Sequence, residues 1–390
     1  MASTQNALDL SSQHNEILLN PRWPKEDFAK LYELANHIQI KENLKAHVWI
    51  ATSGSTASSV AATKLVALSK QALVNSATAV NKHLQSNDKD VWTQVLPSFH
   101  VGGLGIEIRS QLSGAKVVPA LKDERWDPLH FHQVLEKEKC TLSALVPTQV
   151  FDLVSKTLPA PSSLRAVVVG GGVLDQELYR KALVLGWPLL PSYGMTETAS
   201  QIATADLNSL GHPYFPEVKL LSHAQARTNN EGFIEVSSTS LFTMYAQNTF
   251  EGFKSWDPKI NGWFTTEDRG QVLGDNLVIE GRAKDYIKIG GEGTNVARLR
   301  SILENCIQEL FPQNSLNVCI LEMDSQRLGQ EIHMVSLLSA TESEKLVQLY
   351  SEKVLPFEKV RKIHYVSELP RTELGKIKWE ELKRQVKGQL

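Results

Sequence analysis

The sequence has few cysteines and no long hydrophobic run. Its three cysteines, Cys140, Cys306 and Cys319, are widely spaced along 390 residues. Their odd number and the absence of close pairs argue against a disulfide framework and against a zinc site. No apolar stretch approaches the roughly 20 residues that a helix needs to cross a bilayer. We therefore expect a protein of a reducing compartment, with neither disulfides nor a membrane span.

The sequence also lacks a secretory signal and a strong charge of either sign. Residues 1–20 have no basic start and no continuous apolar segment. Because the formal net charge is only −2, we expect neither nucleic acid nor a membrane surface as the main partner. A cytoplasmic protein is the resulting expectation.

What is present is the composition of a globular protein, with 42% hydrophobic and 22% charged residues. A chain of 390 residues exceeds what one hydrophobic core usually fills, so we expect at least two domains. An amphipathic helix over residues 25–40 precedes apolar β-branched runs that alternate with helical patterns, beginning with the strand VWIATS and a helical pattern over 65–85. This alternation predicts an α/β fold in layers, with mostly parallel sheets and with ligands bound beyond the carboxyl ends of the strands.

The pattern changes twice further along the chain. Short runs separated by Asn/Gly turns indicate a small β-rich part over about 205–283. Beyond it, the sequence predicts helices near 296–309 and 342–353, a basic carboxyl-terminal helix, and strands near 315–322, 331–338 and 362–366. We therefore predict a large N-terminal domain over residues 1–283 and a small, mobile α+β domain over residues 284–390.

Several short stretches carry residues suited to binding a nucleotide. Small hydroxyl residues and a glycine follow the first strand, and a run of three glycines follows the apolar strand LRAVVV and lets backbone approach a ligand closely. Their spacing is not that of a dinucleotide fingerprint. The stretches are WIATSGSTASS (49–59), PSYGMTETAS (191–200), GWFTTEDRG (262–270), IEGRAKDYIKIGGEG (279–293) and ELPRTELGKIKWEEL (368–382).

In this order and at these intervals, the set resembles the adenylate-forming superfamily of acyl-CoA synthetases, luciferases and peptide-synthetase adenylation domains. The resemblance covers the chain from about residue 47 to the end. It implies that Tyr193, just before the close turn at Gly194, stacks on adenine, that Thr196 contacts a phosphate, and that Glu197 holds Mg²⁺, which prefers one or two carboxylates plus substrate phosphates. The adenine edge would lie against Gly170, Gly171 and Gly172. Without the resemblance, these residues form a tight turn and a turn with a solvated glutamate.

The resemblance also assigns residues near the end of the chain. Asp268 and Arg282 would hold the ribose hydroxyls, although Glu267 stands where relatives commonly have glycine. Lys376 would stabilise the two anions that meet when a carboxylate attacks the α-phosphorus, and Lys284 would be the hinge on which the small domain moves. The alternatives are surface charges of a hairpin, a solvated lysine in a basic tail, and a linker lysine.

The first stretch departs from the family form TSG-[ST]-T-G-x-P-K. Ala57 stands where glycine is usual, and Lys64 comes four places late. We interpret this as an insertion in a working loop, with weaker or slower nucleotide binding than in relatives; an ordinary Ser/Thr-rich turn is the alternative. The phosphate-binding candidates are Thr52, Ser53, Gly54, Ser55, Thr56 and Lys64.

The runs 96–118, 145–154 and 164–175 most resemble one branch of the superfamily, the o-succinylbenzoate-CoA ligases of menaquinone biosynthesis. By this resemblance, His100 would lie near the acyl carboxylate, and Arg109 would bind the distal carboxylate of a dicarboxylic aryl acid, a structural or helix-capping arginine being the alternative. Thr148, Gln149 and Ser192 are weaker pocket candidates. Relatives carry well over a hundred residues before the phosphate loop, so we expect most of the first subdomain to be absent.

The resemblance implies an acid-CoA ligase that uses ATP, Mg²⁺ and coenzyme A. A carboxylic acid, with o-succinylbenzoate as the first choice, would form an acyl-adenylate and then a thioester. A ligase for another aryl or acyl acid, and a nucleotide-binding relative that has lost catalysis, are the alternatives. The retention of Lys376, Glu197 and Asp268 together argues against the relic. A homodimer is left open.

Overall fold

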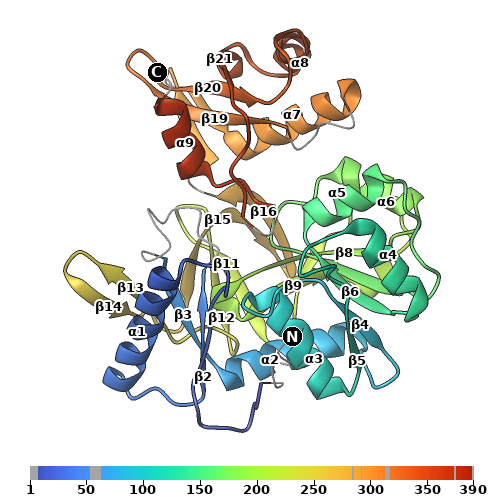
Figure 1. The fold of residues 1–390 in the computed structure, drawn as a ribbon, viewed down its shortest axis with the longest axis vertical. Helices are drawn as coiled ribbons and strands as arrows, with labels where there is room; N and C mark the ends of the chain where they lie inside the picture. The colour runs from blue at the N-terminus through green and yellow to red at the C-terminus, as the bar shows by residue number, and fades with distance from the viewer. Residues whose placement is uncertain are drawn as a thin grey trace. The chain divides into compact units, whose positions relative to one another are not determined.

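The protein is described here by a computed structural model that covers residues 8–52, 63–282, 285–290, 292–311, 317–372 and 375–388 (Figure 1). The chain forms two compact units. The larger comprises Met1–Thr266 and Gln271–Val278, and the smaller comprises Glu267–Gly270 and Ile279–Leu390. The expected boundary between residues 283 and 284 lies outside the described residues.

A mixed five-stranded sheet forms one part of the larger unit. Its strand order is β1 (Glu16–Leu18), β2 (His47–Ala51), β3 (Leu65–Ser69), β13 (Met244–Thr249) and β14 (Gly252–Trp256). β1 and β2 are parallel, whereas β2, β3, β13 and β14 pair antiparallel in turn. The first predicted strand therefore belongs to this mixed sheet and not to a parallel one.

Both faces of β2 and β3 are buried, which explains the unbroken apolar runs of these two strands. Trp49 and Ala67 pack toward α1 (Lys25–Lys41), while Ile50 and Val66 pack toward α2 (Lys70–Leu84) and α3 (Val101–Ser113). The predicted helix over 65–85 is wrong for its first five residues, which form β3. The helix begins only after Ser69, whose hydroxyl accepts a hydrogen bond from the Ala72 N–H.

The parallel pairing predicted from the alternating pattern occurs in the second sheet. β4 (Val91–Gln94), β5 (Lys116–Pro119), β6 (Leu142–Leu145), β7 (Ala166–Val169) and β8 (Leu189–Met195) are parallel, in the order 5-4-6-7-8. α4 (Pro128–Lys137), α5 (Pro147–Ser155) and α6 (Gln176–Val184) lie between these strands in sequence. The α/β class is confirmed, and the carboxyl ends of the parallel strands meet along one edge.

Antiparallel strands extend this sheet, as the Asn/Gly turns after residue 205 predicted. They are β9 (Ser200–Ala205), β10 (Val218–Leu220), β11 (Ala224–Thr228), β12 (Phe233–Ser238), β15 (Phe264–Leu273) and β16 (Asn276–Arg282). β9 pairs antiparallel with both β8 and β10. The eleven-stranded sheet thus joins the predicted parallel and β-rich parts in one structure.

The smaller unit is an α+β structure built on a second sheet of five strands. The strands are β17 (Tyr286–Ile289), β18 (Glu292–Asn295), β19 (Val318–Ser325), β20 (Gly329–Ser336) and β21 (Val360–Tyr365). The helices are α7 (Val296–Leu310), α8 (Ala340–Lys353) and α9 (Trp379–Lys387). One face of the sheet packs on α7 and α8 through Ile320 and Met334, and the other packs on α9 through Leu321 and Val335.

All three cysteines are free and buried, one in the larger unit and two in the smaller. Burial raises the pKa of each thiol, that of Cys319 to about 12. Among the described residues, no helix has both the length and the hydropathy to cross a bilayer.

The turn between β10 and β11 buries a histidine in its neutral form. Both ring nitrogens of His223 are buried, and neither has a hydrogen-bond partner within the described part of the chain. Burial lowers the pKa of this imidazole to about 4. Protons therefore bind His223 more readily in the unfolded chain than in the folded one.

We predict that His223 makes the larger unit less stable in acid. The pKa of His223 in the folded chain lies below its unfolded value of about 6.5. Its contribution to the free energy of unfolding is therefore complete above that pH and is lost as the pH falls toward 4. Urea unfolding at pH 7 and pH 4.5 should show a smaller loss of unfolding free energy in His223→Leu than in wild type. The exposed His14→Leu is the control. An equal loss in all three proteins would contradict the prediction.

Candidate functional site

The glycine turn at the carboxyl end of β7 lies beside β8 and the start of α5, which follows β6. The Ser192 hydroxyl donates a hydrogen bond of 3.0 Å to the Val169 carbonyl. A Cβ on Gly170 would lie 2.8 Å from Ser192 Oγ, and one on Gly172 would lie 3.5 Å from Pro147 Cγ. The structure thus brings the predicted Gly170–Gly172 turn beside Ser192 and the first turn of α5, which carries Thr148 and Gln149.

The turn after β8 is tightly constrained. A Cβ on Gly194 would lie 2.1 Å from the Ser200 carbonyl oxygen, so only glycine fits where β8 and β9 approach. Between them, Thr196–Thr198 form a single 3₁₀ turn, followed by positive φ angles at Ala199 (58°) and Ser200 (152°). Such backbone strain costs about 1–3 kcal/mol per residue and is concentrated at functional sites.

Hydrogen bonds hold the turn in this shape. The Thr198 hydroxyl accepts from the Met195 N–H at 3.0 Å and lies 2.6 Å from the Ser200 carbonyl oxygen. The Glu197 carbonyl accepts from the Phe242 N–H at 2.8 Å. Glu197 and Thr196 are therefore fixed at the carboxyl end of β8, where a ligand of an α/β sheet is expected.

The Glu197 carboxylate is part of a small cluster that also contains Lys64. The Tyr245 hydroxyl donates to Glu197 Oε1 at 2.8 Å, and Lys64 Nζ lies 4.5 Å from the centre of the Tyr245 ring. Tyr245 was missed by the sequence analysis, because it belongs to none of the five stretches. The structure alone reveals that β13 brings it against β3.

Lys64 lies at the base of the predicted phosphate loop. Its carbonyl accepts a hydrogen bond of 3.0 Å from the Thr52 N–H, directly beyond the last β2–β3 pair, Ala51 with Leu65. The lysine therefore lies directly before the returning strand β3. The predicted residues Ser53, Gly54, Ser55 and Thr56 lie outside the described residues.

The donor set around Glu197 fits a magnesium ion that arrives with a nucleotide. The Glu197 carboxylate accepts a hydrogen bond from Tyr245 on one oxygen. Such a carboxylate is the oxygen ligand that Mg²⁺ takes in addition to substrate phosphates. The described residues contain no group of three or more His, Cys, Asp or Glu that could hold a metal without a substrate.

The candidate His100 lies at the start of α3. His100 is the residue before the first turn, and its ring lies 4.8 Å from that of Phe99. Glu107 accepts a hydrogen bond from Ser98 in the loop that leads to His100. Burial raises the pKa of the Glu107 carboxyl.

Arg109 places a positive charge inside the larger unit. The side chain is 1% exposed, and Nη2 donates a hydrogen bond of 2.9 Å to Ser200 Oγ. Its Cζ lies 5.8 Å from the centre of the Trp92 ring, and Nε finds no acceptor within the described ranges. Burial lowers the pKa of this guanidinium to about 10. The side chain therefore hydrogen-bonds the strained turn.

The smaller unit gathers three of the predicted residues. Asp268 and Arg282 form an ion pair, with 3.6 Å between Oδ1 and Nε. Burial, together with the charge of Arg282, lowers the pKa of the Lys376 ammonium to about 8. The Lys376 N–H donates to Thr372 Oγ1 at 3.2 Å, after Gly375 at a φ of +74°. The predicted hinge residue Lys284 lies outside the described residues.

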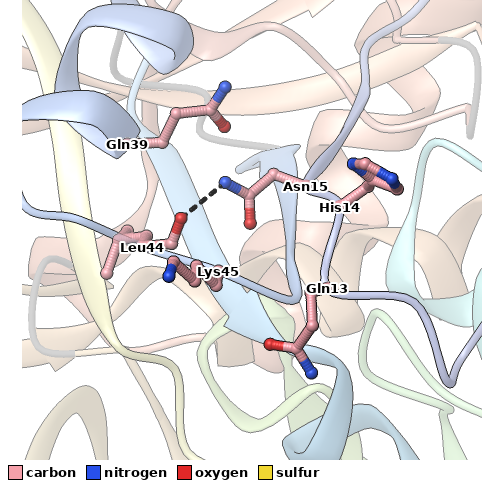
Figure 2. A pocket seen from close by; sticks show the side chains of 6 residues that line it. All are labelled: Gln13, His14, Asn15, Gln39, Leu44 and Lys45. Atoms are coloured by element: carbon pink, nitrogen blue, oxygen red, sulfur yellow. Dashed lines mark hydrogen bonds between the residues drawn. The ribbon is translucent and has the colours of Figure 1, made fainter.

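A polar pocket elsewhere on the larger unit contains none of these candidates (Figure 2). The Asn15 amide crosses it to donate 2.8 Å to the Leu44 carbonyl. The lining residues are Gln13, His14, Asn15, Gln39, Leu44 and Lys45. Its lining shares no residue with the Glu197 cluster, so we place the candidate site at that cluster.

Comparison with known proteins places the chain in a family. A family model described as AMP-binding enzyme matches residues 9–246. A curated 2-succinylbenzoate–CoA ligase of Bacillus licheniformis is 28% identical over 310 residues, which is 77% of this chain and 62% of that protein. The chain thus spans less than two thirds of the length of this relative.

Solved structures resemble the fold over most of the chain. A variant of Escherichia coli MenE with bound OSB-AMS gives a TM-score of 0.68 at 25% identity, covering 88% of this chain and 69% of that one. O-succinylbenzoate coenzyme A synthetase of Bacillus subtilis, in complex with ATP and a magnesium ion, gives 0.69 at 24% identity, covering 86% and 69%.

We predict that Arg109 destabilises the fold. Its charge is buried and pairs with no carboxylate among the described residues, so Arg109→Met should raise the free energy of unfolding by roughly 1 kcal/mol in urea at pH 7. Arg165→Met is the matched control. Arg165 bonds Asp90 at 2.7 Å and the Leu84 carbonyl at 2.7 Å, and its loss should cost roughly 1–3 kcal/mol. If both variants lose stability equally, Arg109 is a structural arginine.

Proposed function

Because the chain belongs to the AMP-binding enzyme family, we propose that it is an ATP-dependent acid-CoA ligase. A carboxylate oxygen attacks the α-phosphorus of ATP and pyrophosphate leaves, giving an acyl-adenylate. The thiolate of coenzyme A then attacks the acyl carbon and AMP leaves. The observation that carries this proposal is the cluster of Glu197, Tyr245 and Lys64 beside the base of the phosphate loop.

The proposed roles of the larger unit follow from charge and position. Glu197 would hold Mg²⁺, which when bound neutralises phosphate charge. Lys64 and Thr52 would bind phosphates from the base of the loop, together with Ser53–Thr56, and Thr196 would contact a phosphate from the strained turn. Tyr193 and the turn Gly170–Gly172 would hold adenine, supported by the contact between Gly170 and Ser192.

The proposed roles of the smaller unit rest on its three gathered residues. Asp268 and Arg282 would bind the ribose hydroxyls as acceptor and donor. Lys376 would bring an ammonium to the two anions that meet during adenylation. We further propose that residues 284–390 form a domain that moves about Lys284 between the two steps. A cytoplasmic location and a homodimer stay predictions.

We propose o-succinylbenzoate as the acid. Arg109 supports a substrate with a second carboxylate, because its buried guanidinium has a hydroxyl partner and, within the described part of the chain, no anionic one. His100, at the start of the same helix, would lie near the reacting carboxylate, with Thr148 and Ser192 lining the pocket. Another aryl or acyl acid, and a nucleotide-binding relative without catalysis, are the alternatives.

The activity is tested by mixing the protein with Mg²⁺-ATP, coenzyme A and single carboxylic acids. We expect pyrophosphate and AMP to appear with o-succinylbenzoate, and Arg109→Met to raise the KM for this acid much more than that for benzoate. If only benzoates or fatty acids react, the ligase activity stands and the assignment of o-succinylbenzoate as the substrate is wrong. If no acid releases pyrophosphate, the ligase proposal is wrong and the alternative of a nucleotide-binding relative without catalysis is favoured.

The lysine is tested by separating the two steps. Lys376→Ala should abolish adenylate formation and leave thioester formation from preformed adenylate. Since the ammonium must be protonated and its pKa is about 8, wild-type adenylation should fall as the pH rises through about 8. The thioester step, measured from preformed adenylate, should lack this fall. Equal loss of both steps in the variant would contradict the assigned role.

A further inference from the structure

We propose that Tyr245 is a positioning residue that orients the Glu197 carboxylate toward magnesium and holds the Lys64 ammonium beside it. This inference rests on the proposed function and adds a residue to it. Tyr245 lies in β13, far in sequence from both partners, and its side chain contacts both.

The tyrosine is itself rigidly held. Its ring is 5% exposed and packs at 4.6 Å from Phe242 and 5.1 Å from Trp256. β13 is paired on both sides, with Val66 of β3 opposite Tyr245 on one side and Trp256 of β14 on the other. The hydroxyl therefore has a fixed position at the edge of a packed aromatic cluster.

From that position the Tyr245 hydroxyl favours one orientation of the Glu197 carboxylate. Glutamate has three side-chain torsions, and ordering them costs free energy when a ligand binds. The 2.8 Å hydrogen bond to Oε1 removes part of that freedom beforehand and occupies one oxygen. Groups that fix a metal-binding side chain in this way typically change metal affinity roughly 10- to 100-fold when they are removed.

The face of the same ring attracts Lys64. An ammonium 4.5 Å from the ring centre is within the range of a cation–π interaction. Because the Lys64 carbonyl also accepts from the Thr52 N–H, the tyrosine holds the lysine at the joined base of the loop. One side chain thus sets the positions of the carboxylate and of the cation that would share the phosphates.

The hydroxyl is tested with Tyr245→Phe, which keeps the ring, its packing and its contact with Lys64. We would measure ATP binding by calorimetry at increasing Mg²⁺, without acid or coenzyme A, so that no turnover occurs. The half-saturating Mg²⁺ concentration should rise roughly tenfold or more, while ATP binding without Mg²⁺ stays unchanged. The matched control is Tyr179→Phe, another buried tyrosine of the larger unit, which should behave as wild type.

The ring is tested with Tyr245→Leu, which should also weaken ATP binding in the absence of Mg²⁺, because Lys64 loses its support. Raising Mg²⁺ should restore adenylation by Tyr245→Phe to the wild-type rate; a merely structural defect would not be restored. Equal Mg²⁺ dependence of Tyr245→Phe and wild type overturns the inference and leaves the proposed function intact. Wild-type protein that binds no ATP overturns both.

Discussion

The close approach of β8 and β9 is the constraint on which the rest of the candidate site depends. Gly194 lies so near the Ser200 backbone that no side chain fits, and the chain between them must turn within a few residues. The turn accepts positive φ at two residues that are not glycine. This turn directs Glu197 toward Tyr245 on one side and Ser200 toward Arg109 on the other. The proposed metal ligand and the proposed carboxylate ligand are therefore connected through one strained segment.

The α/β class and the change to an antiparallel region could be predicted from local patterns. Apolar runs, turn residues and helical spacing act over a few residues, so α7, β21 and the parallel strands follow from them. β3 could not be predicted in this way. Its residues continue without a turn signal into α2, and their strand conformation depends on pairing with β2 and β13.

The candidate site was predictable to the extent that short stretches carry it. Glu197, Lys64 and Lys376 stand in such stretches, whereas Tyr245 stands in an ordinary strand. Its significance depends on a contact with Glu197 across 48 residues. Likewise, the partner of Arg109 is Ser200, 91 residues away, and the sequence offers no signal for it. Pairwise contacts of this range are set by sheet order and not by local spacing.

The burial of every native thiol has a practical consequence for studying the two units. Cysteines with raised pKa and no exposure react slowly with alkylating reagents, so the wild-type chain already offers a silent background for spectroscopic labels. Cysteines introduced at the exposed positions Lys89 and Glu344 would place one probe on each unit. Energy transfer between such probes would report the proposed movement about residue 284, and no native cysteine would have to be replaced first.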